Sequence, residues 1–204
     1  KNIKINNKKA WAQRLSYVGE LGFELYIKMN ESTEIHKLIV DKGKEFNLSH
    51  CGMFAMDTMR MEKGYLHWGH DISPEENQYE AGLNFAISFK KNTDFVGKKA
   101  IEKIKNKKIK KRMVMFTLKN NKPGSPLLLH DEPIYYEGKI VGRTTSGNYS
   151  FQYKKNMSFG YINLTSPIEE LAKKNFFIEV EKKQHEAVLQ TRPLHDPENK
   201  IIKS

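Results

Sequence analysis

The sequence has a single cysteine, Cys51, among its 204 residues, so the fold cannot depend on an internal disulfide bond. This composition favours a reducing compartment. No apolar run approaches the roughly 18 residues that a membrane span requires, which excludes a transmembrane protein. Only five of the 35 basic residues are arginine. Because base-specific contacts favour the bidentate guanidinium group, this scarcity argues against specific recognition of nucleic acid.

The chain also begins without a methionine and without an apolar signal segment behind Lys1. Such a start resembles a cut end, and we expect the chain to be the carboxy-terminal piece of a longer protein. A length of 204 residues suffices for one large domain or two small ones. Aromatic residues make up 11% of the sequence, which argues against disorder.

Lysine is concentrated in the run Lys98–Arg112, which holds nine basic residues and one acid, Glu102. The run carries most of the formal net charge of +11. Its first half has apolar residues at helical spacing, with lysines on the outer face. The simplest interpretation is a solvated linker. The alternative is attraction of a polyanion such as RNA, acidic lipid or a polyglutamate tail, although the run has no aromatic side chain to stack on bases.

The first half of the chain predicts strands mixed with helices. Two glycines within Gly19–Gly22 permit the positive φ angles of a tight connection, so the flanking strands predict a β-hairpin. Asn30 is the expected N-cap of the next helix, and Gly64 the expected end of the one after it. The apolar residues of this later helix are widely spread, which predicts burial on several sides. The predicted elements are strands 11–18, 23–29 and 85–89, and helices 31–46, 52–63 and 97–107.

In the second half of the chain, nearly all of the predicted elements are strands. Turn signals such as Pro123-Gly124 and Ser146-Gly147-Asn148 separate the strands, and this spacing is typical of a small barrel or sandwich. The predicted strands are 113–118, 133–137, 139–145, 159–164, 176–181 and 185–189. We therefore predict an α+β chain with two domains, residues 1–107 and residues 108–204, of which the second is a small antiparallel β-barrel.

The segment Arg14–Ile27 carries the first candidate site. Strand alternation places Glu24 on one face with Gly22 and Tyr26, opposite an apolar row. One interpretation is an ordinary outward-facing glutamate. The other is a carboxylate that accepts two parallel N–H bonds from a planar heterocycle, as carboxylates accept them from guanidinium groups. Tyr17, on the other side of the glycine turn, would then pack against that ring.

The same segment, RLSYVGELGFELYI, resembles the Tyr-Thr-Gly-Glu-x-Gly-Phe/Tyr-Glu motif of the glycine cleavage T-protein (aminomethyltransferase) superfamily. Further matching pieces follow in family order and cover almost the whole chain, which makes the resemblance specific. They are Cys51–Gly64, Glu80–Leu83, Asp94–Lys98 and Gly142–Gly147. Val18 and the run Gly64–Ile72 point to one branch, because they are similar to the C-terminal folate-binding region of dimethylglycine and sarcosine dehydrogenases.

This resemblance implies what the chain binds and what it lacks. In that branch an amino-terminal FAD domain oxidises an N-methyl group, and the T-protein-like region passes the one-carbon unit to tetrahydrofolate. By resemblance, Tyr17 and Glu24 match the positions that pack against and hydrogen-bond the pterin ring. The FAD domain is absent, since the chain has no GxGxxG loop. The aspartate thought to handle protons in the family lies N-terminal to this chain, so the catalytic residue is unknown.

The resemblance also assigns the two predicted domains. Residues 1–107 correspond to the C-terminal portion of an aminomethyltransferase-like folate-binding domain, and residues 108–204 to the C-terminal β-barrel of the T-protein family. The implied partners are folate, an iminium derived from a methylated amine, and the missing N-terminal flavin and folate-domain segments. We expect no membrane partner. The expected compartment is the cytoplasm, or the mitochondrial matrix in a eukaryote.

Four further residues are candidates for lining a pocket or for a structural role: Asp57, Arg60, His67 and Trp68. The first two match the helix motif of the family, but the family's preceding arginine is Met56 here. The spacing His67-x-x-His70-Asp71 suggests a metal site. A third or fourth protein ligand and orienting groups are missing, however, so we expect no metal.

Three functions stay open from the sequence. The first is a tetrahydrofolate-binding, one-carbon (aminomethyl) transfer region of a dimethylglycine or sarcosine dehydrogenase-like enzyme, with no expectation that this piece is active alone. The second is a T-protein-like aminomethyltransferase or a folate-binding protein without catalysis. The third is a basic RNA-binding module that uses Lys98–Arg112.

Overall fold

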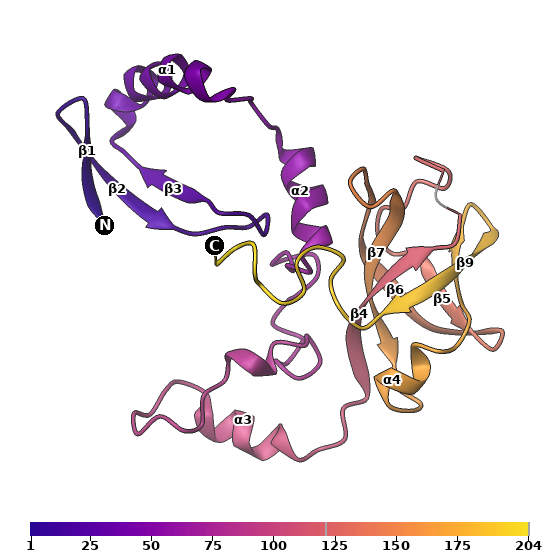
Figure 1. Ribbon diagram of the computed structural model, residues 1–204. Helices are drawn as coiled ribbons and strands as arrows, with labels where there is room; N and C mark the ends of the chain where they lie inside the picture. Colours follow the sequence, from indigo (N-terminus) through magenta and orange to yellow (C-terminus); the bar gives the residue numbers. More distant parts are fainter. Residues whose placement is uncertain (121, 204) are drawn as a thin grey trace.

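The computed structural model describes residues 1–120 and 122–203. An amino-terminal lobe of sheet and helix, residues 1–50, is joined by helix α2 to a β-barrel, residues 111–190 (Figure 1). Residues 84–110 leave the body of the molecule as a separate lobe, which we call the basic excursion. The carboxy-terminal segment, residues 191–203, runs from the barrel back toward the amino-terminal lobe. None of the described helices is long and apolar enough to cross a membrane.

The amino-terminal sheet contains three antiparallel strands in the order β1-β2-β3. They are β1 (Asn2–Ile5), β2 (Lys8–Arg14) and β3 (Phe23–Tyr26). The predicted hairpin is confirmed, with Trp11 paired to Tyr26 and Arg14 paired to Phe23. Strand β2 ends at Arg14 instead of residue 18, while β3 begins at Phe23 as predicted, so residues 15–22 form a loop rather than a tight turn.

Two local features around this sheet differ from the sequence prediction. Strand β1 was not predicted, and the Asn6-Asn7 turn that joins it to β2 has φ angles of 47° and 64°. Asparagine tolerates this left-handed region, so the pair suits a two-residue hairpin. Helix α1 (Ser32–Gly43) is flanked by the 3₁₀ turns Met29–Glu31 and Lys44–Phe46. Asn30 therefore lies inside a 3₁₀ turn, and its prediction as the N-cap is wrong.

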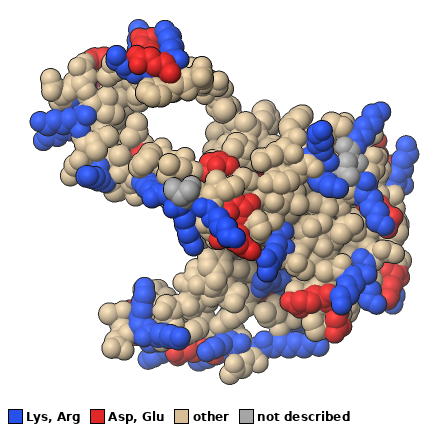
Figure 2. All heavy atoms as spheres, in the orientation of Figure 1, with Lys and Arg blue, Asp and Glu red and all other residues tan. Residues whose placement is uncertain are grey.

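Helix α2 (Met53–Glu62) ends as predicted, with Gly64 at a φ of 80°. Its last turn is buried and packs against strands β6 and β7 of the barrel. The prediction of burial on several sides is wrong for the first half, where Met53 is 72% exposed and Phe54 is 89% exposed. This half of α2 borders the opening that the amino-terminal lobe and α2 surround (Figure 2).

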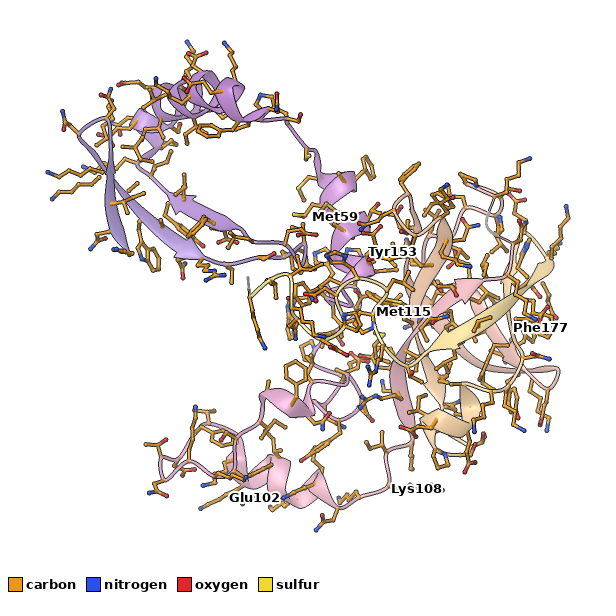
Figure 3. The ribbon with its side chains drawn as sticks, in the orientation of Figure 1. Met59, Glu102, Lys108, Met115, Tyr153 and Phe177 are labelled. Carbon is orange, nitrogen blue, oxygen red and sulfur yellow. The ribbon has the colours of Figure 1, made fainter. Side chains whose placement is uncertain are left out.

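The basic excursion contains the predicted helix but lacks the predicted strand. Residues Asn84–Ala86 form a 3₁₀ turn instead of the strand 85–89. A strand needs a partner edge for its backbone hydrogen bonds, and this segment has none beside it among the described residues. Helix α3 (Lys98–Lys105) has no buried residue. Figure 3, where Glu102 and Lys108 are labelled, shows the excursion standing away from the barrel.

The second half of the chain forms a closed antiparallel barrel with the strand order β4-β7-β6-β5-β8-β9. The strands are β4 (Lys111–Leu118), β5 (Pro133–Tyr136), β6 (Lys139–Ser150), β7 (Lys155–Asn163), β8 (Phe176–Val180) and β9 (Lys183–Gln190). All six predicted strands are confirmed, and with them the predicted fold class. Helix α4 (Ile168–Leu171), between β7 and β8, is a single turn.

One predicted turn in the barrel is wrong. Strand β6 continues through Ser146-Gly147-Asn148, after a register shift between Thr144 and Ser146. Glycine has a packing role here, because a Cβ atom at Gly147 would lie 2.5 Å from the backbone of Leu128. The glycine therefore marks a close approach between a strand and a loop, and not a chain reversal.

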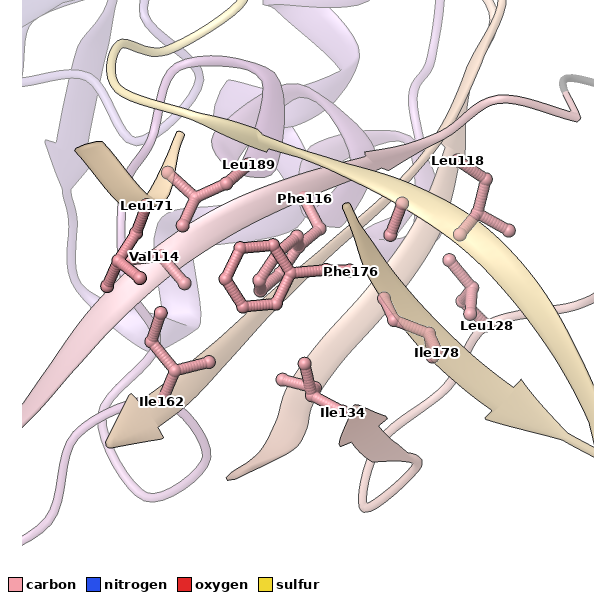
Figure 4. Close-up of a cluster of buried hydrophobic side chains, with 11 residues drawn as sticks. Val114, Phe116, Leu118, Leu128, Ile134, Ile162, Leu171, Phe176, Ile178 and Leu189 are labelled. Carbon is pink, nitrogen blue, oxygen red and sulfur yellow. The ribbon is translucent and has the colours of Figure 1, made fainter. Parts of the chain in front are cut away.

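Two apolar clusters hold the barrel and attach α2 to it. Inside the barrel, the rings of Phe116 and Phe176 lie 5.3 Å apart between centroids, at the centre of the side chains drawn in Figure 4. The second cluster joins α2 to the barrel strands and consists of Met61, Met113, Met115, Met157 and Phe159. The amino-terminal lobe is thus attached to the barrel mainly through the end of α2.

Candidate functional site

A cavity of about 640 Å³ lies where the end of α2, the barrel and the carboxy-terminal segment meet. Its apolar floor includes Met113, Met115 and Phe159. Aromatic and cationic side chains stand around this floor: Tyr17, Tyr65, Phe85, Arg112 and Arg192. Aromatic walls combined with guanidinium groups suit a planar ligand that also carries an acidic group.

Tyr17 lies in this cavity, as one of the two residues predicted to bind a ring. Its hydroxyl donates a hydrogen bond of 3.1 Å to the backbone oxygen of Leu66. Its ring stacks on that of Tyr65, with centroids 6.3 Å apart and planes 14° apart. Burial raises the pKa of Tyr17, so the phenol stays neutral and can donate.

Glu24 lies outside the lining of this cavity, on strand β3. The hydroxyl of Tyr26 donates a hydrogen bond of 2.6 Å to Glu24 Oε2, so the two side chains share one face of the sheet, as alternation predicts. Trp11 lies on the same face, with its ring centroid 5.1 Å from that of Tyr26. No hydrogen bond or ring contact joins Glu24 to Tyr17 in the part of the chain that the structure describes.

Arg60 is a buried hub between α2, the loop after it and the barrel. Its guanidinium donates to Asp57 Oδ1 at 2.7 Å, Asp71 Oδ2 at 2.5 Å and Ser146 Oγ at 2.9 Å. The side chain of Asp57 also accepts a hydrogen bond from Asn148 of β6. Because these partners occupy the buried guanidinium, Arg60 presents no free group to a ligand, and together with Asp57 it fastens α2 to the barrel.

His67 and Trp68 lie at the surface on the loop after α2. Trp68 is 67% exposed, and the His67 ring stacks on that of His70 with centroids 4.8 Å apart. Asp71 is turned inward, where it accepts hydrogen bonds from Arg60 and from the backbone N–H of His67. Within residues 1–120 and 122–203, no group of three or more His, Cys, Asp or Glu side chains is placed to hold a metal ion.

Arg112 is a cavity residue that the sequence did not single out, because it reads as the last member of the basic run. Its guanidinium is half-buried, which lowers its pKa, and it donates a hydrogen bond to the backbone oxygen of Tyr79. Gly82, at a φ of 78°, lets the guanidinium pass close to the backbone. Its position was an available signal, since Arg112 stands directly before the predicted strand 113–118, which is largely apolar.

Two family models match the chain. The model described as the GCVT N-terminal domain matches residues 1–91. The model described as the glycine cleavage T-protein C-terminal barrel domain matches residues 111–196. The second range contains all six barrel strands and the start of the carboxy-terminal segment.

Similar proteins include dehydrogenases of methylated glycines and aminomethyltransferases. The chain is 36% identical over 196 residues to dimethylglycine dehydrogenase, mitochondrial, of Homo sapiens, a match that covers 95% of this chain and 22% of the human protein. It is 35% identical over 149 residues to an aminomethyltransferase of Halothermothrix orenii, covering 73% of this chain and 40% of that protein. The chain thus spans less than half the length of either relative.

A solved structure has the same fold. The crystal structure of the glycine cleavage system aminomethyltransferase T from Bartonella henselae superposes with a TM-score of 0.77 at 22% sequence identity. The superposition covers 91% of this chain and 50% of that chain. The amino-terminal lobe and the barrel therefore occur together in a longer molecule.

Proposed function

The chain belongs to the glycine cleavage T-protein family, and on that premise we propose that it forms the tetrahydrofolate-binding, one-carbon-transfer region of an enzyme similar to dimethylglycine and sarcosine dehydrogenases. The observation that carries the proposal is the cavity beside Tyr17, at the junction of the two regions that the family models match. Its composition fits a folate, which joins flat aromatic rings to a glutamate tail.

The described residues divide the recognition of folate between two places. In the cavity, Tyr17, Tyr65 and Phe85 offer aromatic faces, and Arg112 and Arg192 offer positive charge for a carboxylate. We assign Glu24, on the sheet, to the amino-pyrimidinone edge of the pterin. Its Oε2 already accepts a hydrogen bond from the hydroxyl of Tyr26, so the carboxylate is oriented before a ligand arrives.

The chemistry asked of this chain is modest. Tetrahydrofolate, when bound, supplies the N5 amine that accepts a one-carbon unit from an iminium. The chain's own residues would hold the pterin in register and keep water away from the iminium. Tyr17 contributes a neutral hydroxyl, held by Leu66, but no residue of this chain is assigned as the proton-transfer group. That group would come from the preceding part of the folate domain.

A missing partner is supported by the exposed apolar surface of the amino-terminal half. Phe23 is 62% exposed, Met29 is 91% exposed and Phe46 is 80% exposed. Met53 and Phe54 on α2 are exposed as well. Several large apolar side chains exposed to this extent are unusual on a surface that no partner covers. We propose that the N-terminal folate-domain segments cover this surface and that a flavin domain with FAD precedes them, because the chain covers 22% of the human dehydrogenase.

The same resemblance supports proposals for the domain boundary and for the cellular compartment. We place the division between the folate-binding portion and the barrel at residues 107 and 108, just before strand β4. We place the enzyme in the mitochondrial matrix if its source is a eukaryote, since the similar human dehydrogenase is named as mitochondrial, and otherwise in the cytoplasm.

The test is a titration with reduced folate, followed by Trp11 and Trp68 fluorescence. Binding at Glu24 should quench Trp11, which contacts Tyr26, and a Trp68→Phe variant should retain the signal. Absence of quenching, both in this chain and in the longer enzyme, would contradict the proposal. The RNA alternative predicts instead an affinity for RNA that weakens steeply with salt, and the comparisons give it no support.

A second assay separates transfer from mere binding. In the longer enzyme, an iminium that meets tetrahydrofolate gives methylene-tetrahydrofolate, whereas an iminium that meets water releases formaldehyde. The proposal expects added tetrahydrofolate to suppress the formaldehyde and to yield the methylene product. Folate binding without this change would favour a folate-binding protein that has lost catalysis.

A further inference from the structure

The carboxy-terminal segment crosses from the end of β9 to the loop of residues 15–22, which carries Tyr17. It also lines the cavity through residues Thr191, Arg192, Pro193 and Asp196. At its far end, the Arg14 guanidinium donates a hydrogen bond of 3.2 Å to the backbone oxygen of Ile202. The segment therefore touches the barrel, the cavity and the amino-terminal lobe in turn.

His195 is the buried centre of this segment. It is 4% exposed, and its backbone N–H donates to the oxygen of Glu62 at 2.9 Å. Its Nδ1 lies 2.9 Å from the hydroxyl of Tyr153, a residue labelled in Figure 3 between α2 and the barrel. On the opposite side, its Nε2 lies 2.8 Å from Oε1 of Glu20, in the Tyr17 loop. The imidazole thus stands between the barrel and the loop.

The contact with Tyr153 bears on which ring nitrogen of His195 carries the proton. If the Tyr153 hydroxyl donates to Nδ1, the remaining ring proton is on Nε2, the ring nitrogen that lies beside the Glu20 carboxylate. Nε2 is buried and makes no hydrogen bond among the described residues, and its close neighbour is the Glu20 carboxylate at ion-pair distance. Burial, followed by the nearby carboxylates of Glu62, Glu20 and Asp196, raises the pKa of Tyr153, which keeps its hydroxyl protonated. The contact to Glu20 is the one that ties His195 to the loop.

A second contact supports the same loop from beneath. Lys63 Nζ donates to the backbone oxygen of Asp196 at 2.6 Å and to its Oδ2 at 2.9 Å. The stem of Lys63 lies under Gly19, where an added Cβ would be 2.7 Å from Lys63 Cγ and Cδ. The loop therefore rests on a side chain that the carboxy-terminal segment holds in place.

We propose that His195, through Glu20, is a positioning residue that fixes the Tyr17 loop over the cavity. Tyr17 lies three residues before Glu20, and its hydrogen bond to Leu66 orients the ring without anchoring the far side of the loop. The significance for folate rests on the proposed function. The fastening of the loop itself does not depend on it.

Hydrogen exchange on the full chain, without ligand, tests the fastening directly. Loss of the close contact between His195 and the Glu20 carboxylate should speed amide exchange in residues 15–22 on the order of 10-fold in His195→Leu and in Glu20→Gln. His195→Gln, whose amide can still donate toward Glu20, should restore most of the protection. The exposed His130→Gln on the barrel is the matched control and should change nothing in this loop.

The outcomes separate the proposals. Unchanged exchange of the loop in Glu20→Gln, a variant at a partly exposed side chain that should fold normally, would overturn the positioning role. So would equal and additive effects of the two substitutions in the double variant, since residues acting through one contact are not additive. If the loop loosens but the wild-type chain and the longer enzyme bind no tetrahydrofolate, the proposed function fails and the positioning role stands.

Discussion

Arg60 shows what a single residue decides in this molecule. The sequence left it as a pocket-lining or structural candidate, and its partners make it structural: two carboxylates, a hydroxyl and the backbone oxygen of Tyr65. Its side chain is 2% exposed, and that of Asp71 is fully buried. A buried charge pair of this kind is costly to break, because removal of one partner leaves the other without compensation.

Replacing Arg60 by methionine should therefore lower the free energy of unfolding by about 3–5 kcal/mol. Arg143→Met is the control, because Arg143 is 73% exposed and its ion pair with Asp131 should contribute less than about 1 kcal/mol. Urea unfolding of both variants measures the difference. Equal losses in the two variants would contradict the role of Arg60 as the link between α2 and the barrel.

Glu24 is the residue on which the folate assignment depends most. Glu24→Gln keeps the shape of the side chain but presents an NH₂ group where an acceptor is needed. Loss of a charged hydrogen-bond partner costs on the order of 1.5–3 kcal/mol, or roughly 10- to 150-fold in tetrahydrofolate affinity. Calorimetric titration checks this, with the exposed Glu45→Gln as the control. An unchanged affinity would reject the assignment of Glu24.

At the scale of elements, the basic excursion is the feature that the proposed function leaves unexplained. It departs from the body beside Phe85 and returns at Arg112, and both residues line the cavity. Helix α3 contributes no buried residue, so its lysines face solvent. A ligand in the cavity with an anionic tail would therefore extend past a positively charged lobe.

We expect a modest preference for folates with longer glutamate tails. Each exposed ion pair is worth less than about 1 kcal/mol, but several together should favour pentaglutamyl over monoglutamyl tetrahydrofolate at low salt. Affinities measured at low and high ionic strength provide the check. If tail length makes no difference at low ionic strength, the excursion is a solvated linker, as the simpler sequence interpretation has it.

The carboxy-terminal segment should respond to acid through Asp196. Burial alone would raise the pKa of this carboxyl, but hydrogen bonds from Lys63 and from the backbone N–H groups of residues 200–202 lower it to about 2. A lowered pKa means that the contribution to stability is present above the ordinary value of about 3.9 and is lost as the pH falls through the lowered one.

We therefore expect the segment to loosen as the pH falls from about 4 toward 2. Hydrogen exchange of residues 196–203 measures this release in the wild-type chain. Asp196→Asn should remove most of the pH dependence, whereas the exposed Asp94→Asn should leave it unchanged. Identical pH profiles for the wild-type chain and Asp196→Asn would show that the carboxylate does not hold the segment.

At the scale of the whole molecule, the barrel is a closed unit and the amino-terminal half is not. The barrel pairs every strand on both edges, while the sheet β1-β2-β3 is open and the lobe has large exposed apolar side chains. Figure 2 shows the opening that the lobe and α2 surround. Exposed apolar surface of this kind is typical of an interaction site, and the partner proposed for it is the preceding segments of the folate domain.

Substitution on that surface should weaken its association with those segments. Exposed Met53 and Phe54 would each bury side-chain area worth about 1.5–3 kcal/mol, so changing both to serine should cost at least about 100-fold in affinity. Co-purification of the two parts measures this. Phe151→Ser, at an equally exposed ring on the barrel, is the control and should bind normally. Loss of binding in the control alone would contradict the proposed surface.

Much of the architecture could be predicted because it depends on local pattern. The six barrel strands carry β-branched and aromatic residues at strand spacing, and Gly64 ends α2 at a positive φ that favours glycine. The failures have physical causes as well. The expected strand at residues 85–89 lacks a partner edge, and the expected turn at Gly147 is a close contact with Leu128 inside a strand.

The candidate site was predicted only in part, for a similar reason. Tyr17 and Glu24 belong to one short motif that a sequence displays directly. Arg112 is distant in sequence from Tyr17, and the two residues line one cavity because the folded barrel and the closure of the chain around it bring the start of β4 and the Tyr17 loop to the same cavity. No spacing rule joins residues that meet only through such closure.

The sequence by itself determined the family, the α+β class and the barrel, because composition, glycine positions and motif order act within short stretches of chain. The tertiary structure decided which charged groups are structural and which are free. Arg60, Lys63 and His195 read as ordinary polar residues until folding buries each beside a specific partner. Burial and pairing are properties of contacts between distant segments, and long-range contacts are what a linear pattern does not contain.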